Sequence, residues 1–162
     1  MQRTSAYSGF IITFTFAIAL LLMVIPLPSS LENYRPEWLL LMIIYWAAYA
    51  PKRVSIGIGW MSGLLLDVLQ GTLLGEYALV GMITAYVANQ LHQRLQLFPT
   101  LQQCIFVFLL LGTQFILIMW IQGFSGHPIQ GWQYGLPIVV SAILWPFIKG
   151  LMGWLQRRYK IK

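Results

Sequence analysis

Few side chains in this 162-residue sequence have the types and spacing that a chemical site requires. There is one cysteine, Cys104, and there are two histidines, His92 and His127. Transition-metal sites need three or four clustered nitrogen or sulfur ligands, so these residues do not predict a metal centre. Ser62 and Ser141 lie in apolar stretches, whereas the two histidines are expected at opposite membrane faces. A Ser–His nucleophilic pair is therefore not expected.

Catalytic sequence motifs are also missing from the chain. It contains no Gly-rich phosphate loop, no His-Glu-x-x-His zinc motif and no Gly-x-Ser-x-Gly nucleophile turn. The sequence therefore predicts a protein that is not an enzyme and that uses no cofactor and no metal.

The most informative pattern is a row of small residues with one acid at its centre. Gly59, Gly63, Asp67, Gly71 and Gly75 recur every four positions, which keeps them near one face of a helix. Glycines on such a face let a second backbone approach closely, as in helix association in lipid. Two interpretations stay open: the face packs against the protein's own helices, or part of it docks a partner's transmembrane helix. Gly71 and Gly75 are better explained by a tight turn after the helix than by a place on this packing face.

Asp67 continues this row, so its side chain is expected to face protein and not lipid. It is predicted near the C-terminal end of its helix, where the helix dipole opposes a carboxylate. It therefore needs a donor, such as a hydroxyl, a backbone N–H or Arg35. We hypothesise that Arg35 pairs with Asp67, with Glu32 and Glu37 as local competitors for Arg35.

The elements that position these residues are expected to lie in hydrocarbon. The chain is 59% hydrophobic and 9% charged, whereas soluble domains carry about 25% charged residues. A chain this apolar could not cover a water-facing surface. The net charge of +6 comes from basic residues in short gaps between apolar runs, not from one patch. Nucleic acid is therefore not an expected partner.

Apolar runs divide the chain into six segments. The sequence predicts one all-α membrane domain over residues 1–162, with transmembrane helices over 9–25, 36–50, 54–69, 73–91, 101–122 and 132–155. Pro36 is expected in the first turn of its helix, where its missing N–H costs nothing. The segments 36–50 and 54–69 span only about 22–24 Å, against a hydrocarbon core of about 30 Å. A re-entrant hairpin therefore competes with two full crossings.

The distribution of charge favours six crossings with both termini in the cytoplasm. On that topology, nine of the ten basic residues fall on the inner side: Arg3, Lys52, Arg53, Arg94, Lys149, Arg157, Arg158, Lys160 and Lys162. The outer side receives Arg35 and all four acids, which are Glu32, Glu37, Asp67 and Glu76. This asymmetry satisfies the positive-inside rule. A re-entrant hairpin would leave Lys52 and Arg53 at membrane depth, which is costly.

Interface signals at the predicted helix ends agree with this topology. Aromatic residues gather at the outer interface (Tyr34, Trp38, Tyr77, Trp120, Trp132, Tyr134) and at the inner one (Tyr7, Tyr49, Trp154, Tyr159). Trp145-Pro146 lies within the last segment, where a proline predicts a kink. The basic stretch 154–162 predicts attraction to anionic lipids, at about 1 kcal/mol per basic residue.

Three stretches resemble, in order, the rod shape-determining protein MreD family. Residues 34–46 resemble the Arg-Pro-x-Trp segment of that family, residues 59–75 resemble its central motif, and residues 144–147 look like its final helix. The resemblance covers nearly the whole chain. The motif positions that it carries over are Arg35, Pro36, Trp38, Gly59, Gly63, Asp67, Gly71, Gly75, Trp145 and Pro146.

This resemblance implies a non-enzymatic component of the bacterial cell-elongation machinery in the inner membrane. The partners it implies are the single-pass protein MreC, the MreB filament (directly or through MreC), RodA and a class B penicillin-binding transpeptidase. The implied fold is similar to the substrate-binding subunits of vitamin transporters. An alternative function is therefore a small-molecule-binding membrane subunit of a transporter. The spacing of Ala17 and Ala19 in the first segment and the short loops disfavour that alternative.

Overall fold

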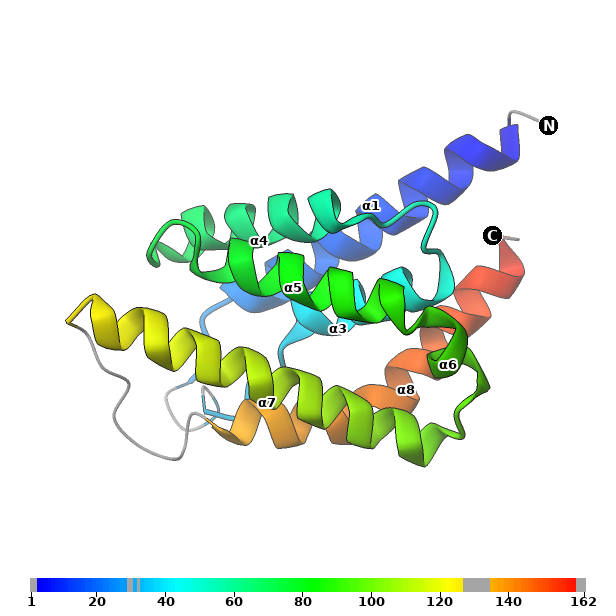
Figure 1. Cartoon of the computed structure of the whole chain (residues 1–162). Coiled ribbons are helices and arrows are strands. Elements are labelled where there is room, and N and C mark those ends of the chain that lie inside the picture. Colours follow the sequence, from blue (N-terminus) through cyan, green and yellow to red (C-terminus); the bar gives the residue numbers. More distant parts are fainter. Residues whose placement is uncertain (1–2, 29–30, 32, 127–134, 160–162) are drawn as a thin grey trace.

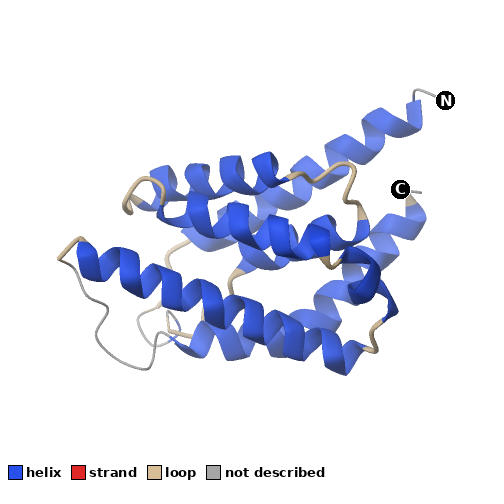
Figure 2. Cartoon of the chain, viewed as in Figure 1, coloured by secondary structure: helices blue, strands red, loops and turns tan. Residues whose placement is uncertain are grey.

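The computed structural model describes residues 3–28, 31, 33–126 and 135–159, with side chains from residue 9 onward. Within these ranges the chain forms seven α-helices and no strand (Figure 2). The helices are α1 (Arg3–Val24), α3 (Trp38–Tyr49), α4 (Ile56–Gln70), α5 (Glu76–Gln90), α6 (His92–Leu97), α7 (Thr100–Phe124) and α8 (Leu136–Arg158). The all-helical fold class is thus confirmed.

Each predicted segment overlaps one of the longer helices, but the boundaries differ. Segment 36–50 begins as a helix only at Trp38, whose N–H bonds to the carbonyl of Pro36 at 2.9 Å. The prediction that Pro36 occupies the first helical turn is therefore wrong. The short helix α6 was not predicted. It follows α5 after Leu91, ends before Phe98 and is anchored by Leu95, which is 2% exposed.

Some sequence predictions concern positions outside the described residues. These are the positions of Glu32, His127, Trp132, Tyr134, Lys160 and Lys162, together with the side chains of Arg3 and Tyr7. The start of the predicted segment 132–155 belongs to the same group, and α8 is described from Leu136.

The helices run back and forth between two ends of an elongated bundle (Figure 1). The N-terminal end of α1, the C-terminal end of α8, the α3–α4 connection and the α6–α7 corner lie at one end. The α4–α5 turn, the end of α7 and the start of α8 lie at the other. We call these the basic end and the acidic end, after Lys52, Arg94 and Arg157 at one and Asp67 and Glu76 at the other.

The centre of the bundle is α3, which is apolar on every face. All residues from Leu39 to Ala48 are buried, and the helix packs against α1, α5 and α8. A helix that is hydrophobic all round belongs in a core. Polar contacts also hold its rotation: the Trp46 indole donates to Thr15 Oγ1 of α1 at 2.9 Å, and the Tyr45 hydroxyl donates to Gln156 Oε1 of α8 at 2.9 Å.

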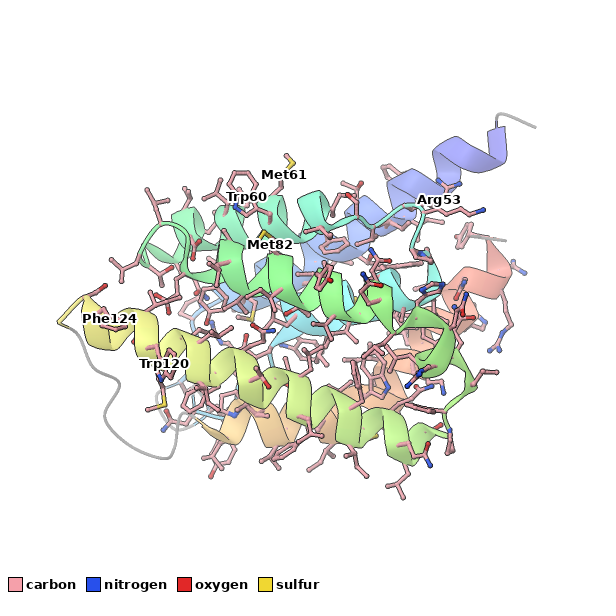
Figure 3. All side chains as sticks on the ribbon, viewed as in Figure 1. Arg53, Trp60, Met61, Met82, Trp120 and Phe124 are labelled. Atoms are coloured by element: carbon pink, nitrogen blue, oxygen red, sulfur yellow. The ribbon has the colours of Figure 1, made fainter. Side chains whose placement is uncertain are left out.

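The outer surface of the bundle is also apolar. Large hydrophobic side chains point away from it in Figure 3, including Met61 (66% exposed), Trp120 (66%) and Phe124 (92%). Soluble monomers rarely expose apolar patches on this scale. Two described helices, α7 and α8, are long and apolar enough to cross a membrane, and shorter apolar helical stretches cover 9–24, 38–49 and 56–70. The surface is suited to hydrocarbon.

Candidate functional site

The Asp67 carboxylate lies in a closed cradle at the acidic end of the bundle. It is 0% exposed, although its side chain is polar. Its Oδ1 accepts hydrogen bonds from the Thr72 hydroxyl at 3.1 Å and the Tyr77 N–H at 2.8 Å. Its Oδ2 accepts from the N–H groups of Gly75 at 3.0 Å and Ala78 at 3.1 Å. Four donors therefore surround this one side chain.

Three of these donors are backbone N–H groups at the start of α5. The first N–H groups of a helix have no partner within the helix, and they form the positive end of its dipole. Asp67 lies in the last turn of α4. Its two carboxylate oxygens accept hydrogen bonds from these N–H groups across the α4–α5 turn. The carboxylate thus caps the neighbouring helix and fixes the hairpin that α4 and α5 form.

The glycines that precede Asp67 bring the two helices of this hairpin into backbone contact. A Cβ built on Gly59 would lie 2.5 Å from the carbonyl oxygen of Gly81. A Cβ on Gly63 would lie 2.5 Å from the carbonyl carbon of Tyr77 and 2.7 Å from the Cα of Ala78. These atoms belong to α5 and cannot rotate away. The structure therefore places Gly59 and Gly63 against the protein's own helix.

Gly71 and Gly75 have a different role in the turn between the two helices. Gly71 ends α4 at φ +66° and Gly75 precedes α5 at φ +103°. Side chains other than glycine rarely adopt these conformations. Neither residue would bring a Cβ within 4 Å of another group, so backbone conformation and not space requires glycine here.

Arg35 does not pair with Asp67, so that hypothesis is wrong. Its guanidinium donates instead to the carbonyl oxygens of Met23 and Ile25. The Gln70 amide also donates to the Met23 carbonyl, at 3.2 Å. Carbonyls at a helix C-terminus lack partners and form the negative end of the dipole, which suits a cation. Arg35 therefore caps α1, while Asp67 is satisfied locally.

Polar atoms that lack partners lie between the start of α3 and the facing side of α7. The Glu37 N–H donates to Ser141 Oγ of α8 at 2.9 Å. However, Glu37 Oε2 and both amide atoms of Gln114 have no hydrogen-bond partner. Glu37 and Gln114 line a cavity of about 20 Å³ between α3, α7 and α8. The motif positions Pro36 and Trp38 flank Glu37 just before and at the start of the helix.

Trp145, the next motif position, lies in a polar cluster between α7 and α8. It is 1% exposed, and its indole N–H donates to Gln103 Oε1 at 3.1 Å. The Gln103 amide nitrogen donates to the carbonyls of Leu95 at 2.6 Å and Phe98 at 3.0 Å. Gln103 therefore ties α6, the turn before α7 and α8 together. Pro146 lies within α8, which continues to Arg158.

Gln103 and Gln114 lie on one helix and each is 1% exposed, which makes them a matched pair. Gln103→Met removes four hydrogen bonds, to Tyr49, Leu95, Phe98 and Trp145, and each such bond in a membrane protein contributes about 0.6 kcal/mol. We expect a loss of about 2 kcal/mol in unfolding free energy, measured by denaturation in detergent. Gln114→Met removes an amide whose atoms have no partner, so it should leave stability unchanged or raise it. Equal losses would contradict this assignment.

Several of these contacts were not predicted from sequence. Besides Gln103, the Gln122 amide donates to Glu76 Oε1 at 2.6 Å and joins α7 to α5. A polar residue inside an apolar helix is expensive in lipid and is expected to face protein. Gln103 and Gln114 are eleven residues apart, about three helical turns, so they share a face. That spacing within an apolar segment is the sequence signal that could have identified these buried glutamines.

The chemistry of these polar groups is structural. The lone pairs of Asp67 are occupied by four donors, so it is not arranged to abstract a proton from a substrate. In the described part of the chain, no three His, Cys, Asp or Glu side chains come close enough to hold a metal ion. The arrangement holds helix ends together.

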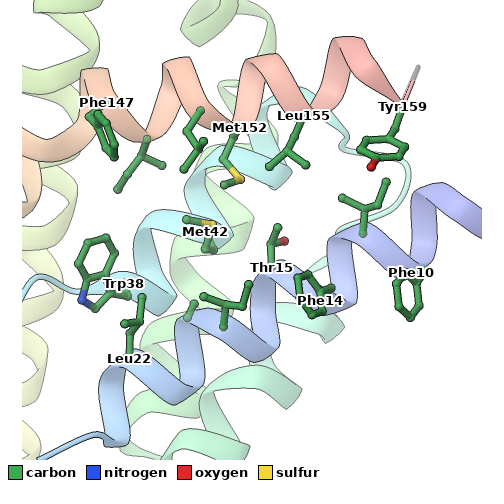
Figure 4. A pocket seen from close by; sticks show the side chains of 15 residues that line it. Phe10, Phe14, Thr15, Leu22, Trp38, Met42, Phe147, Met152, Leu155 and Tyr159 are labelled. Atoms are coloured by element: carbon green, nitrogen blue, oxygen red, sulfur yellow. The ribbon is translucent and has the colours of Figure 1, made fainter.

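A long groove separates α1 from α8 on one side of the bundle, with α3 as its floor (Figure 4). Its volume is about 580 Å³. It extends from Leu22 and Trp38 at one end to Phe10 and Tyr159 at the other. The Thr15 hydroxyl within it already donates to the Ile12 carbonyl and accepts from Trp46. This groove therefore suits hydrocarbon.

Comparison with known proteins identifies the family of the chain. A family model described as rod shape-determining protein MreD matches residues 3–154. The chain is similar to the rod shape-determining protein MreD of Haemophilus influenzae, with 32% identity over 166 residues that cover 99% of each chain. No solved structure matches it. With a match along nearly its whole length, this chain belongs to the rod shape-determining protein MreD family.

Proposed function

We propose that this protein is a non-enzymatic membrane component of the bacterial cell-elongation complex. It binds MreC and helps to couple MreB filaments, directly or through MreC, to peptidoglycan synthesis by RodA and a class B penicillin-binding transpeptidase. The observation that carries this proposal is the family match over residues 3–154. The buried polar groups support its non-enzymatic part, because Asp67, Glu76 and Gln103 bond to other helices of the bundle and not to an open pocket.

The proposal includes a topology of six crossings of the inner membrane with both termini in the cytoplasm. Positive charge at one end of the bundle and acids at the other support it. The helices α3 and α4 have 12 and 15 residues, short for a hydrocarbon core of about 30 Å. Because α3 is enclosed by other helices, it does not itself have to match the thickness of the lipid.

The transporter-subunit alternative receives less support. A polar small molecule in the α1–α8 groove would meet apolar side chains and a Thr15 hydroxyl that already has two partners. Small-molecule sites normally provide a few well-placed polar groups that orient the ligand.

Depletion and replacement in a rod-shaped host test the proposal. The host's own MreD is depleted while this chain, its Gly57→Ala variant or its Gly63→Ala variant is supplied. We expect round cells and loss of MreC from MreB pull-downs after depletion, and recovery with the unchanged chain and with Gly57→Ala. The Gly63→Ala variant should restore neither rod shape nor the MreC–MreB complex, because its added Cβ would meet the α5 backbone.

Membrane levels of each variant are measured alongside cell shape. Depleted cells that stay rod-shaped with an intact MreC–MreB complex would refute the proposal. The same conclusion follows if the unchanged chain reaches normal membrane levels but does not restore MreC to the complex.

A further inference from the structure

Two adjoining cavities of opposite chemistry lie between α7 and α8. The first, of about 430 Å³, is at the basic end, and the second, of about 420 Å³, lies nearer the middle of the bundle. Pro146 lines both of them. Thr100 borders the first and the next residue, Leu101, borders the second. Both cavities therefore follow the same pair of helices on either side of Pro146, and we refer to them together as the α7–α8 cleft.

The basic part of the α7–α8 cleft has the features of an anion site. Its described lining contains two cations, Lys149 and Arg157, and no acid. Lys149 is half-buried, and its Nζ lies 3.4 Å from Thr100 Oγ1. A Cβ on Gly150 would meet nothing within 4 Å, and one on Gly153 only the Tyr45 oxygen at 3.8 Å. The two glycines therefore leave room beside the cations.

The apolar part of the cleft faces the surface that suits hydrocarbon. Its lining includes Leu101 (74% exposed), Ile105 (53%) and Ile143 (71%). No charged side chain lines it among the described residues. Basic pockets between transmembrane helices commonly bind the head groups of anionic lipids. Here a basic pocket and an apolar groove of similar volume share Pro146 as a lining residue.

We propose that the α7–α8 cleft binds one anionic glycerophospholipid. The phosphate of the lipid lies near Lys149 and Arg157, and an acyl chain follows the apolar part beyond Pro146. A free phosphate ion would leave the apolar part unused, and an apolar helix would bring no charge for Lys149. The larger α1–α8 groove lacks this combination, because no cation lines it among the described residues. The inference rests on the membrane location proposed above, but not on the role in cell shape.

Photolabelling of the full-length protein in nanodiscs tests this site. The probe is phosphatidylglycerol with a photoreactive group on one acyl chain, compared with the same probe built on phosphatidylcholine. Labelled residues are identified by mass spectrometry. We expect phosphatidylglycerol to label the apolar part of the α7–α8 cleft several-fold more than phosphatidylcholine does. Excess inorganic phosphate should not reduce this labelling.

Matched variants separate a specific site from general surface attraction. Lys149→Gln with Arg157→Gln should weaken phosphatidylglycerol binding about 30-fold. Lys52→Gln with Arg53→Gln removes the same charge away from the cleft and should change binding less than threefold. Ile143→Trp should fill the apolar part and remove labelling there. The control is Leu109→Trp, because Leu109 lies on α7, is 61% exposed and does not line this cleft. This control should leave labelling unchanged.

Three results would overturn the proposal: equal labelling by the two lipids, equal effects of the two charge-removing pairs, or displacement of the probe by inorganic phosphate. The last result would assign the basic part to a free anion. Because these measurements use purified protein, they can fail while the replacement experiment in cells succeeds, and the reverse also holds.

Discussion

Replacing Asp67 with asparagine is expected to destabilise the protein by about 3–5 kcal/mol. Asparagine keeps one acceptor oxygen, but its amide nitrogen would face the N–H groups of Gly75 and Ala78. Two charge-assisted hydrogen bonds are lost, each contributing about 1.5–3 kcal/mol, and two buried donors are left without an acceptor. The free energy of unfolding in mixed detergent micelles measures the effect. Most proteins have a total stability of only about 5–15 kcal/mol, so the loss is large.

Two control variants distinguish the loss of the hydrogen bonds around Asp67 from the removal of a buried acid as such. Thr72→Val removes only one hydroxyl donor, so we expect a loss of about 1 kcal/mol. Glu76→Gln removes another buried acid at the same end, but glutamine still offers an oxygen to Gln122. Its effect should stay below that of Asp67→Asn. If Asp67→Asn costs no more than Glu76→Gln, the carboxylate does not cap α5 as described.

Replacing Gly63 with alanine is expected to cost about 3 kcal/mol, at the upper end for overpacking. The added Cβ would lie 2.7 Å from the Cα of Ala78 and still closer to the Tyr77 backbone, so α4 and α5 must separate. Separation would also lengthen the hydrogen bonds from α5 to Asp67. The measurement is again unfolding free energy, together with the spacing of the two helices from spin labels on their exposed faces.

Gly57 on the same helix provides the matched control. A Cβ there would meet only Ser55 Oγ, at 3.7 Å. Gly57→Ala should therefore raise stability by up to about 1 kcal/mol, the difference in helix propensity. Equal changes at Gly57 and Gly63 would show that close packing of α4 on α5 is not what requires glycine.

The helical content was readable from the sequence because apolar runs and prolines mark it. Each longer helix lies largely within one predicted segment, whereas α6 was missed because six residues with one buried leucine carry little periodic signal. The row from Gly59 to Asp67 was recognised as one face, since four-residue steps keep to one side of a helix.

The partners of these residues could not be predicted in the same way. Arg35 and Asp67 carry opposite charges, so an ion pair was the simplest hypothesis. In the structure each group satisfies the end of a different helix, Arg35 at the carbonyls of α1 and Asp67 at the N–H groups of α5. Every helix end has backbone groups without a partner in the helix. Which side chain satisfies them depends on how the helices pack, which the order of residues does not reveal.

The proposed function requires that the basic end of the bundle lies in the cytoplasm and the acidic end on the outer side of the membrane. Single cysteines introduced at Lys52 and Leu74, in a Cys104→Ser background, test it with a membrane-impermeant maleimide. Leu74 is 73% exposed in the α4–α5 turn, and Lys52 lies in the α3–α4 connection. In spheroplasts, we expect labelling at position 74 at once and at position 52 only after permeabilisation. Labelling of both positions from the same side would contradict this topology.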